Sequence, residues 1–409
     1  MKFLSTSLLL VSMFAAVQVQ AEMQTTAPGA AEIHSLSQDE GIRFSCKAGQ
    51  LAKVEAAMDA YLASLEIAPD LLVKKMQLDK GRLLYTLNTP PNDTNTLDFS
   101  KRPEFKLAEE LVNLPQQDGS NKIIYTVSKK EIVLALLQHG RLTQFRDKAC
   151  DIAALQDNVA IRQNTVAWAQ HLTWVWPDGE RAEWNEKYWH RGTPKPGVAL
   201  SVALNDVFMN QDKYAIGCYT ATKLVVVQGI LDYYSRIKKS PSQLKLVEDR
   251  LMHDKDPLVG IEPARAWDFE KDFDPHDLDH PGKLLKVKEG VRPMNFVPGD
   301  WAYFLNTDPV SYEKTGYEGS NAIYLGRNKF DDYYDDNNHS YSYYQKLDEV
   351  YQWRNGVFSR SRDFAKIKPL SPQDVERLSK RPAEGGLLKS IRITPYQFAY
   401  EELPRLADH

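Results

Sequence analysis

The chain has 409 residues, more than one hydrophobic core usually organises, so two domains are expected. Its formal net charge of -4 gives no electrostatic reason to expect nucleic acid or an anionic membrane as a partner. The composition leaves a protein, a peptide or a small molecule as the substrate.

The first 21 residues contain Lys2, an apolar run of about a dozen residues, and the small residues Val19 and Ala21. This pattern predicts a secretory signal peptide over residues 1–21. No cysteine follows the apolar run, and no later stretch approaches the ~18 apolar residues of a membrane span. We therefore expect a secreted or periplasmic protein without a membrane span, whose signal peptide is followed by a flexible lead-in over residues 22–40.

The first packed region is expected over residues 41–160, as an α+β domain whose role the sequence does not indicate. Apolar residues three and four apart predict a helix over 47–66. Residues 80–91 predict a short strand, and residues 121–140 predict a strand followed by a helix with Ser128 as its N-cap.

The chain has three cysteines, Cys46, Cys150 and Cys218, and an odd count in an exported protein leaves an intermolecular bridge or one reactive thiol. The sequence allows three pairings. A bridge between Cys46 and Cys150 is favoured, because both lie in the first half of the chain and Cys218 lies in a different setting. Three unpaired buried thiols are the alternative, since spacing does not establish the Cα approach that a disulfide requires.

Two stretches have compositions that could suit a binding site. Residues 173–192 hold four of the eight Trp residues, which either line a groove or, as we favour, cover a core edge. Residues 254–282 are acidic and Pro-rich, and they predict a long surface loop. This loop contains four potential metal ligands, His276, Asp277, Asp279 and His280. We expect no metal site there, because a flexible loop does not fix the ligand geometry.

The residues around Cys218 are the most informative about chemistry. The residues that follow it have helical spacing, which places Cys218 at a helix N-terminus directly after Gly217. There the helix dipole and backbone N–H groups lower a thiol pKa and can stabilise an oxyanion. A cysteine at a helix start is more often simply a small buried residue, so this position alone does not identify a nucleophile.

The chain after the acidic loop predicts strands over 295–306, 322–325 and 339–343, the last followed by a helix. One helix with a Cys at its start, beside antiparallel strands that carry a His, is a layout in which an imidazole can reach the thiol. After about Phe364 the chain predicts polar loops, with residues 389–396 as a last strand.

Two runs of sequence carry a family resemblance. They are WNEKYW…RG…KPGVALSVALNDVFMNQDKYAIGCYTATKLVVVQGILDYY and PGDWAYFLNTDP…YEGSNAIYLG. Together they resemble the bacterial spore-coat type protein-glutamine gamma-glutamyltransferases, small transglutaminases related to the NlpC/P60 papain-like fold. The resemblance covers about residues 180–355. It implies an α+β catalytic domain over 161–409, with the nucleophile at a helix N-terminus packed on an antiparallel sheet.

The resemblance implies that Cys218 is the nucleophile and that a His near Gly326 is its catalytic partner. The family has this His seven residues after the Gly, whereas His339 lies thirteen residues after Gly326. A six-residue insertion over 331–336, with the sequence DDYYDD, reconciles the two spacings. The expected substrate-binding residues are Tyr214, Trp301 and Asn321.

The family's catalytic Glu has no direct counterpart, because Ser320 stands at the aligned place. Glu318 lies two residues earlier, and the period of two in a strand can direct it to the same face. Glu318 is therefore predicted to substitute. The acidic residue that the family often has before its Cys is Gly217 here.

The function implied by the resemblance is acyl transfer from a glutamine side chain. Cys218 would attack the γ-carboxamide, His339 would protonate the departing ammonia, and a lysine amine would take the thioester to form an isopeptide crosslink. Water in place of the amine would give deamidation. The partners are then proteins or peptides with Gln and Lys side chains, and no metal or other cofactor is required.

Two alternatives stay open. The first keeps the fold and makes the chain an NlpC/P60-type cell-wall peptide amidase or peptidase. The second makes it an inactive structural relative, because Ser320 replaces the family's Glu.

Overall fold

The computed structural model describes residues 40–146, 149–190, 192–253, 286–288, 294–335, 340–358 and 363–393. The expected signal peptide, nearly all of the lead-in, the acidic loop with its potential metal ligands, and His339 lie outside the described residues. No helix in the described part of the chain is long and apolar enough to cross a membrane.

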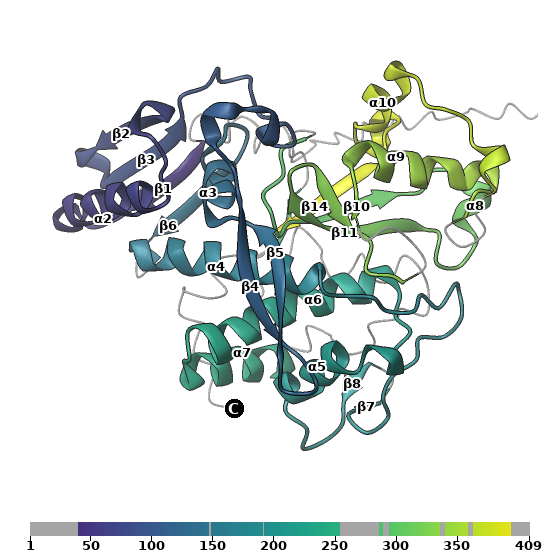
Figure 1. Cartoon of the computed structure of the whole chain (residues 1–409). Coiled ribbons are helices and arrows are strands. Elements are labelled where there is room, and N and C mark those ends of the chain that lie inside the picture. The colour runs from purple at the N-terminus through teal and green to yellow at the C-terminus, as the bar shows by residue number, and fades with distance from the viewer. Residues whose placement is uncertain are drawn as a thin grey trace, which may run out of the picture.

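A four-stranded sheet forms the first part of the fold, in the order β2-β3-β1-β6 (Figure 1). Its strands are β1 (Gly41–Ser45), β2 (Leu72–Gln77), β3 (Arg82–Leu87) and β6 (Leu142–Arg146). Strand β1 pairs antiparallel with β3 and parallel with β6. Helix α2 (Leu51–Ser64) follows β1, and its buried residues are Leu51, Val54, Met58, Tyr61 and Leu62. The spacing of three and four therefore predicted this helix correctly.

A hairpin and two helices connect this sheet to the rest of the chain. The hairpin consists of β4 (Glu109–Pro115) and β5 (Asn121–Val127), and α3 (Lys129–Leu137) follows it. Ser128 caps α3 by accepting the Glu131 N–H, which confirms the predicted cap. Helix α4 (Ile152–Ala169) begins after Asp151, whose carboxylate accepts the Ala153 N–H.

A six-stranded antiparallel sheet lies in the second part of the chain, in the order β13-β12-β11-β10-β14-β9. Its strands are β9 (Lys286–Lys288), β10 (Trp301–Leu305), β11 (Gly319–Gly326), β12 (Lys329–Asp331), β13 (Ser340–Tyr341) and β14 (Leu388–Ile393). The sequence predicted β10, β11, β13 and β14, but it did not indicate β9 or β12. The mixture of helices and sheets is an α+β fold.

The further helices of this part are α5 (Leu200–Met209), α6 (Cys218–Asp232), α7 (Pro241–His253), α8 (Pro309–Tyr312), α9 (Tyr343–Gln352) and α10 (Pro372–Leu378). Helices α6 and α9 contact the sheet, α5 and α7 pack against α6, and α10 packs against α9. A short hairpin of β7 (Trp189–His190) and β8 (Thr193–Pro194) lies before α5. Helix α10 corrects the expectation of polar loops after Phe364. It forms because Ser371 and Asp374 make a capping box around its first turn.

Helices α4 and α6 pack against each other in the middle of the molecule (Figure 1). They approach so closely at Gly229 that a Cβ there would lie 2.1 Å from Thr165 Oγ1. Nearly every residue of α6 is buried, so this helix is held on all sides. Its first turn is thereby fixed against β11, which α6 also contacts.

The two parts of the chain share one cluster of buried residues. Helix α4 runs through residue 160, where we expected a domain boundary, and it contacts both α3 and α6. Thr96 Oγ1 donates to Phe296 O at 2.6 Å, which joins segments 200 residues apart. The division into an N-terminal domain and a catalytic domain stays a prediction.

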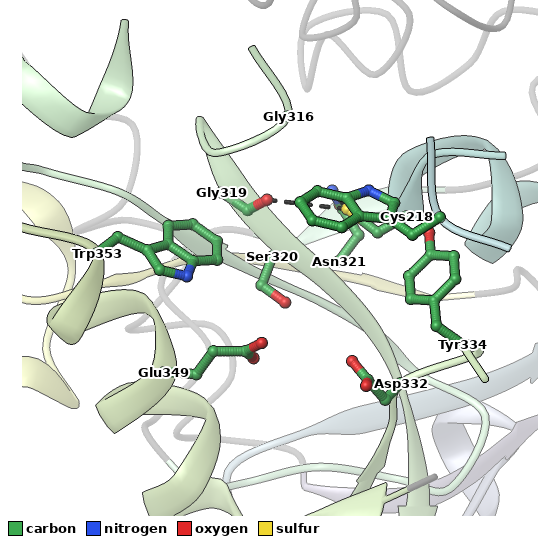
Figure 2. Close-up of a pocket in the computed structure, with 10 residues that line it drawn as sticks. Cys218, Gly316, Gly319, Ser320, Asn321, Asp332, Tyr334, Glu349 and Trp353 are labelled. Carbon is green, nitrogen blue, oxygen red and sulfur yellow. Dashed lines mark hydrogen bonds between the residues drawn. The ribbon is translucent and has the colours of Figure 1, made fainter. Parts of the chain in front are cut away.

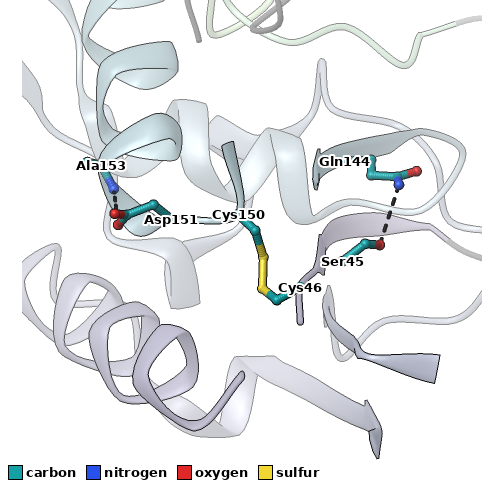
Figure 3. Close-up of a disulfide and its surroundings, with 6 residues drawn as sticks. All are labelled: Ser45, Cys46, Gln144, Cys150, Asp151 and Ala153. Atoms are coloured by element: carbon teal, nitrogen blue, oxygen red, sulfur yellow. Dashed lines mark hydrogen bonds between the residues drawn. A yellow bond between two sulfur atoms is a disulfide. The ribbon is translucent and has the colours of Figure 1, made fainter. Parts of the chain in front are cut away.

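One disulfide joins Cys46 to Cys150, with their Cα atoms 5.5 Å apart (Figure 3). Cys46 directly follows β1, and Cys150 directly precedes the Asp151 cap of α4. The predicted pairing is confirmed, and Cys218 is left as a free thiol.

Replacing Cys46 and Cys150 together by Ala is expected to lower the free energy of unfolding by about 2–5 kcal/mol. The bridge joins residues 104 positions apart, so its loss releases a large loop in the unfolded chain. Urea titration of the oxidised protein and the double variant measures this difference. Equal unfolding midpoints would show that the bridge does not contribute to stability.

Candidate active site

Cys218 is the first residue of α6, and Gly217 is the N-cap. Three contacts hold this turn. Tyr334 Oη donates to Ile216 O at 2.9 Å, Thr222 Oγ1 donates to Cys218 O at 2.7 Å, and Ala221 N donates to Gly217 O at 2.9 Å. The predicted helix start is confirmed, and the thiol lies at the positive end of the helix dipole.

Two polar groups of β11 contact the thiol (Figure 2). Cys218 Sγ donates to Gly319 O at 3.8 Å, and Asn321 Nδ2 lies 3.5 Å from the sulfur as a donor. Trp301 Nε1 on β10 donates to Asn321 Oδ1 at 2.8 Å. The indole therefore fixes the amide so that its N–H₂ group, rather than its oxygen, faces the sulfur.

Burial raises the pKa of the Cys218 thiol above its usual value, and this is the largest influence on it. Hydrogen bonds from Asn321 and the positive charge of Lys346 act in the opposite direction, but they do not outweigh burial. The expectation that the helix start lowers this pKa toward neutrality is therefore wrong for this structure. The thiol is protonated at neutral pH and needs a base to become a nucleophile.

An Asn321→Leu variant is expected to react more slowly with iodoacetamide near pH 7.5, by several-fold, because the thiolate loses a hydrogen-bond donor. In both proteins the rate should rise with pH through a thiol pKa above the usual value, and the variant's curve should lie at higher pH. The reaction is quenched at set times and the fraction of modified Cys218 is measured by mass spectrometry, which gives both curves. A variant curve at lower pH would contradict the role given to the amide.

A pocket of about 400 Å³, including open space at its mouth, surrounds the thiol. It is lined by Trp176, Cys218, Gly316, Gly319, Ser320, Asn321, Asp332, Tyr334, Glu349 and Trp353. Tyr317 packs edge-on against both Trp176 and Trp353 at ring distances of 5.1 and 5.2 Å, so the two indoles share one aromatic support. Of the four Trp residues in 173–192, Trp174 and Trp189 are core residues as favoured, whereas Trp176 lines the pocket.

Lys346 forms a buried ionic cluster at the pocket wall. Its Nζ lies 3.0 Å from Glu349 Oε2, 3.4 Å from Asp332 Oδ1 and 3.3 Å from Ser320 Oγ. Burial alone would lower the pKa of Lys346, but the charges of Glu349 and Asp332 outweigh it and raise the pKa, so the ammonium stays charged. In Figure 2 the carboxyl groups of Asp332 and Glu349 face one another below the Ser320 hydroxyl.

The structure brings only some of the predicted site residues together. Asn321 contacts the thiol, and Trp301 is fully buried behind Asn321. Tyr214 is also in the core, where its hydroxyl donates to Asp206 at 2.5 Å, and it does not line the pocket. Glu318 Oε1 accepts the Gly316 N–H at 3.1 Å, and its charge acts to raise the pKa of the Cys218 thiol. His339 lies outside the described residues.

The last residue of β12 and the three residues after it are part of the core. Asp331, Asp332, Tyr333 and Tyr334 are all buried. Tyr333 lies seven residues after Gly326, which is the spacing at which the family has its His. The Tyr333 hydroxyl is 3.0 Å from Thr222 Oγ1, four residues after Cys218 on α6. A tyrosine therefore stands near the thiol at the position where the resemblance implies an imidazole.

The sequence interpretation missed the cluster of Lys346, Glu349 and Asp332. The signal available was the i, i+3 spacing of Lys346 and Glu349 on a predicted helix, which alone indicates only a surface ion pair. Nothing in the sequence placed Asp332 opposite that helix. Among the described residues, no group of three or more His, Cys, Asp or Glu side chains is arranged to hold a metal ion.

The curated relatives with which the chain aligns are bacterial. A protein-glutamine gamma-glutamyltransferase of Bacillus mycoides (strain KBAB4) is 27% identical over 149 residues, and one of Bacillus cereus (strain AH820) is 26% identical over 149 residues. Each alignment covers 35% of this chain and 42% of the relative, so it concerns less than half of those proteins.

A solved transglutaminase from Geobacillus stearothermophilus, without its C-terminal extension, is 19% identical; the superposition covers 60% of this chain and 95% of that one. Its TM-score of 0.36 is too low to support a conclusion about this fold.

The model of the family described as protein-glutamine gamma-glutamyltransferase matches residues 111–336, which is more than half of the 409 residues. The match contains the start of α6, the β10–β11 pair and Asp332. The chain therefore belongs to the protein-glutamine gamma-glutamyltransferase family.

Proposed function

We propose that the chain is an exported enzyme that joins glutamine and lysine side chains of proteins or peptides through a thioester on Cys218. The observation that carries this proposal is the position of the thiol. It is partly exposed, lies at the start of α6, opens into the pocket and is contacted by the Asn321 amide. Family membership supports the same chemistry.

In the first half of the proposed reaction the sulfur forms a bond to the carboxamide carbon, and the C–N bond to ammonia breaks. The negative charge that develops on the oxygen is stabilised by the N-terminal end of α6 and by the Asn321 N–H₂ group. His339 is the proposed proton donor to ammonia, and Glu318 is proposed as its carboxylate partner. Because the free thiol is protonated, its proton must leave to a base as the sulfur attacks.

We further propose that the catalytic part has the NlpC/P60 papain-like fold and that residues 41–160 form an additional domain. The packing of α6 against β11, with the nucleophile at the helix start, supports the first statement. The disulfide between Cys46 and Cys150 supports export, because such bonds persist in oxidising compartments.

An inactive relative is the second candidate, and two substitutions favour it. Ser320 stands where the family has its Glu, and Tyr333 stands at the spacing of the family's His. If both catalytic partners are lost, the fold would serve as a scaffold or binding protein. This candidate predicts a thiol that can be labelled but no turnover of any glutamine donor.

The deciding experiment measures ammonia release from a glutamine-containing protein together with incorporation of a fluorescent alkylamine, beside turbidity loss of peptidoglycan. Amine incorporation supports the proposed crosslinking, and ammonia release without incorporation supports deamidation. Wall lysis without incorporation would indicate the cell-wall peptidase instead. A His339→Ala variant in the same assays tests the imidazole, because full retention of activity would remove His339 from the mechanism.

A further inference from the structure

Trp353 lines the pocket and carries an indole N–H without a partner. Its side chain is 4% exposed, and among the described residues no acceptor lies within hydrogen-bond distance of Nε1. Native proteins leave few buried N–H groups in this state, because such a group has given up its bond to water without a replacement. A ligand that brings an acceptor into the pocket would supply the missing bond.

The position of this N–H is fixed before any ligand arrives. Trp353 directly follows α9, and Tyr317 packs edge-on against its ring at a centroid distance of 5.2 Å. In Figure 2 the indole nitrogen lies on the lower edge of the ring, toward Ser320 and Glu349. A donor held in this way loses little conformational freedom when a ligand binds.

Ser320 supplies a second donor at the same wall of the pocket. Lys346 Nζ donates to Ser320 Oγ at 3.3 Å. An ammonium group can only donate, so the serine oxygen is the acceptor in this bond and its hydroxyl hydrogen is not used in it. Ser320 stands where the family has its Glu, so a side chain that accepts is replaced here by one that can donate.

Two donors at one wall select an oxygen atom that accepts. The oxygen of the reacting carboxamide has its own donors at the other end of the pocket, from Asn321 and the start of α6. In the view of Figure 2, Ser320 lies between Trp353 and Cys218, so one ligand can reach both ends. A glutamine residue within a peptide carries main-chain carbonyl oxygens a few bonds from its carboxamide, and a simple primary amide carries none.

We propose that the Trp353 N–H and the Ser320 O–H bind a main-chain carbonyl oxygen of the peptide that carries the reactive glutamine. This inference rests on the proposed function, since it assigns a substrate subsite to the same pocket. The two residues determine specificity, because they favour a peptide over a small amide. They also position the carboxamide against the sulfur, so part of their effect falls on kcat.

The first test observes the indole N–H directly by NMR. It uses the Cys218→Ala protein, which binds the peptide without reacting, with nitrogen-15 in its eight Trp residues. The Trp353 signal is identified by its absence when Trp353→Phe is added. N-acetylglutamine N-methylamide is expected to move this signal downfield, because a hydrogen bond deshields the proton. Butyramide, which has the carboxamide but no main chain, should leave the signal in place.

The second test compares the same two donors in the active protein by ammonia release. For Trp353→Phe, kcat/KM for the glutamine peptide is expected to fall about tenfold, the usual effect of losing one hydrogen bond. The value for butyramide should not change. Ser320→Ala should lower the preference for the peptide several-fold, and it is the test variant if Trp353→Phe does not fold.

Trp189→Phe is the matched control, because it removes the same part of a buried indole. Trp189 Nε1 donates to Ala203 O at 3.2 Å, and Trp189 does not line the pocket. This variant should keep the preference for the peptide. It should also lower the thermal midpoint more than Trp353→Phe does, since only Trp189→Phe breaks a hydrogen bond within the protein.

A Trp353 signal that does not move at the highest soluble peptide concentration would overturn the subsite, whatever the activity. A shift of the same size with butyramide, or equal losses of kcat/KM for both donors, would overturn it as well. Failure of the proposed function has a different signature. The peptide would then still move the Trp353 signal, and the wild-type protein would release no ammonia from either donor.

Discussion

Cys218→Ala is expected to abolish amine incorporation, with a loss of at least about 10³-fold, because no other described residue of the pocket offers a thiol to form the thioester. The fold should be kept. The side chain is partly exposed and makes only weak contacts through its sulfur, at 3.5 and 3.8 Å. Fluorescent amine transfer to a glutamine protein measures the activity, and thermal melting measures the stability.

The double Ala variant of Cys46 and Cys150 is the matched control for this result. It removes the other two cysteines, so it should lose stability and keep the ability of Cys218 to be labelled. Activity that survives in Cys218→Ala would exclude the thioester mechanism. Covalent labelling confined to Cys218 in the wild-type protein would identify the nucleophile independently.

Asp300→Ala is expected to be the most damaging substitution for stability among the residues that support the site. Asp300 is fully buried, and its carboxylate lies 2.7 Å from Arg141 and 2.9 Å from Arg162. Removing it leaves two buried guanidinium groups without their shared partner, for which about 3–5 kcal/mol is typical. Urea unfolding at pH 7 measures the loss.

The pH dependence of this carboxylate has a definite sign. Burial acts to raise the pKa of Asp300, but the charges of Arg141 and Arg162 outweigh it and hold the pKa below the usual value. The stabilisation is therefore complete above the unfolded pKa of ~3.9 and is lost as the pH falls through the lower folded pKa.

Glu384→Ala is the control for Asp300→Ala. Glu384 also pairs with an arginine, Arg381, but both side chains are about half exposed, at 49% and 48%. Its removal should not shift the unfolding midpoint measurably. Equal midpoints for Asp300→Ala and the wild-type protein would show that the two arginines are solvated without their carboxylate.

The sequence predicted those features that depend on neighbouring residues. The helix that begins at Cys218 follows from spacing within one turn, and the Ser128 cap follows from a strand directly before a helix. The pairing of Cys46 with Cys150 followed from an odd count and from the different setting of Cys218. The helix start and the cap were predictable because each involves a few consecutive residues, whereas the disulfide was predicted by counting cysteines and not by a local rule.

The remaining features depend on distant segments, and periodicity does not report them. Asp332, Lys346 and Glu349 meet because β12 and α9 pack together, and residues 331–334 look polar in sequence although they are buried. The thiol pKa was predicted from the helix dipole and the backbone N–H groups of the first turn. Burial by β11 and the pocket walls proved the larger influence, and its size depends on the tertiary structure.

The hydrogen bond from Trp301 to Asn321 determines which end of the Asn321 amide faces the Cys218 sulfur. The two ends of an amide have nearly the same shape and opposite polarity, so packing alone cannot tell them apart. The indole N–H does so, because it is a donor and can pair only with the oxygen end of the amide. A Trp301→Phe protein would keep an aromatic ring and lose this choice. If the Asn321 amide rotated by 180°, its oxygen would present a lone pair to the sulfur. The side chain that now stabilises the thiolate would then repel it.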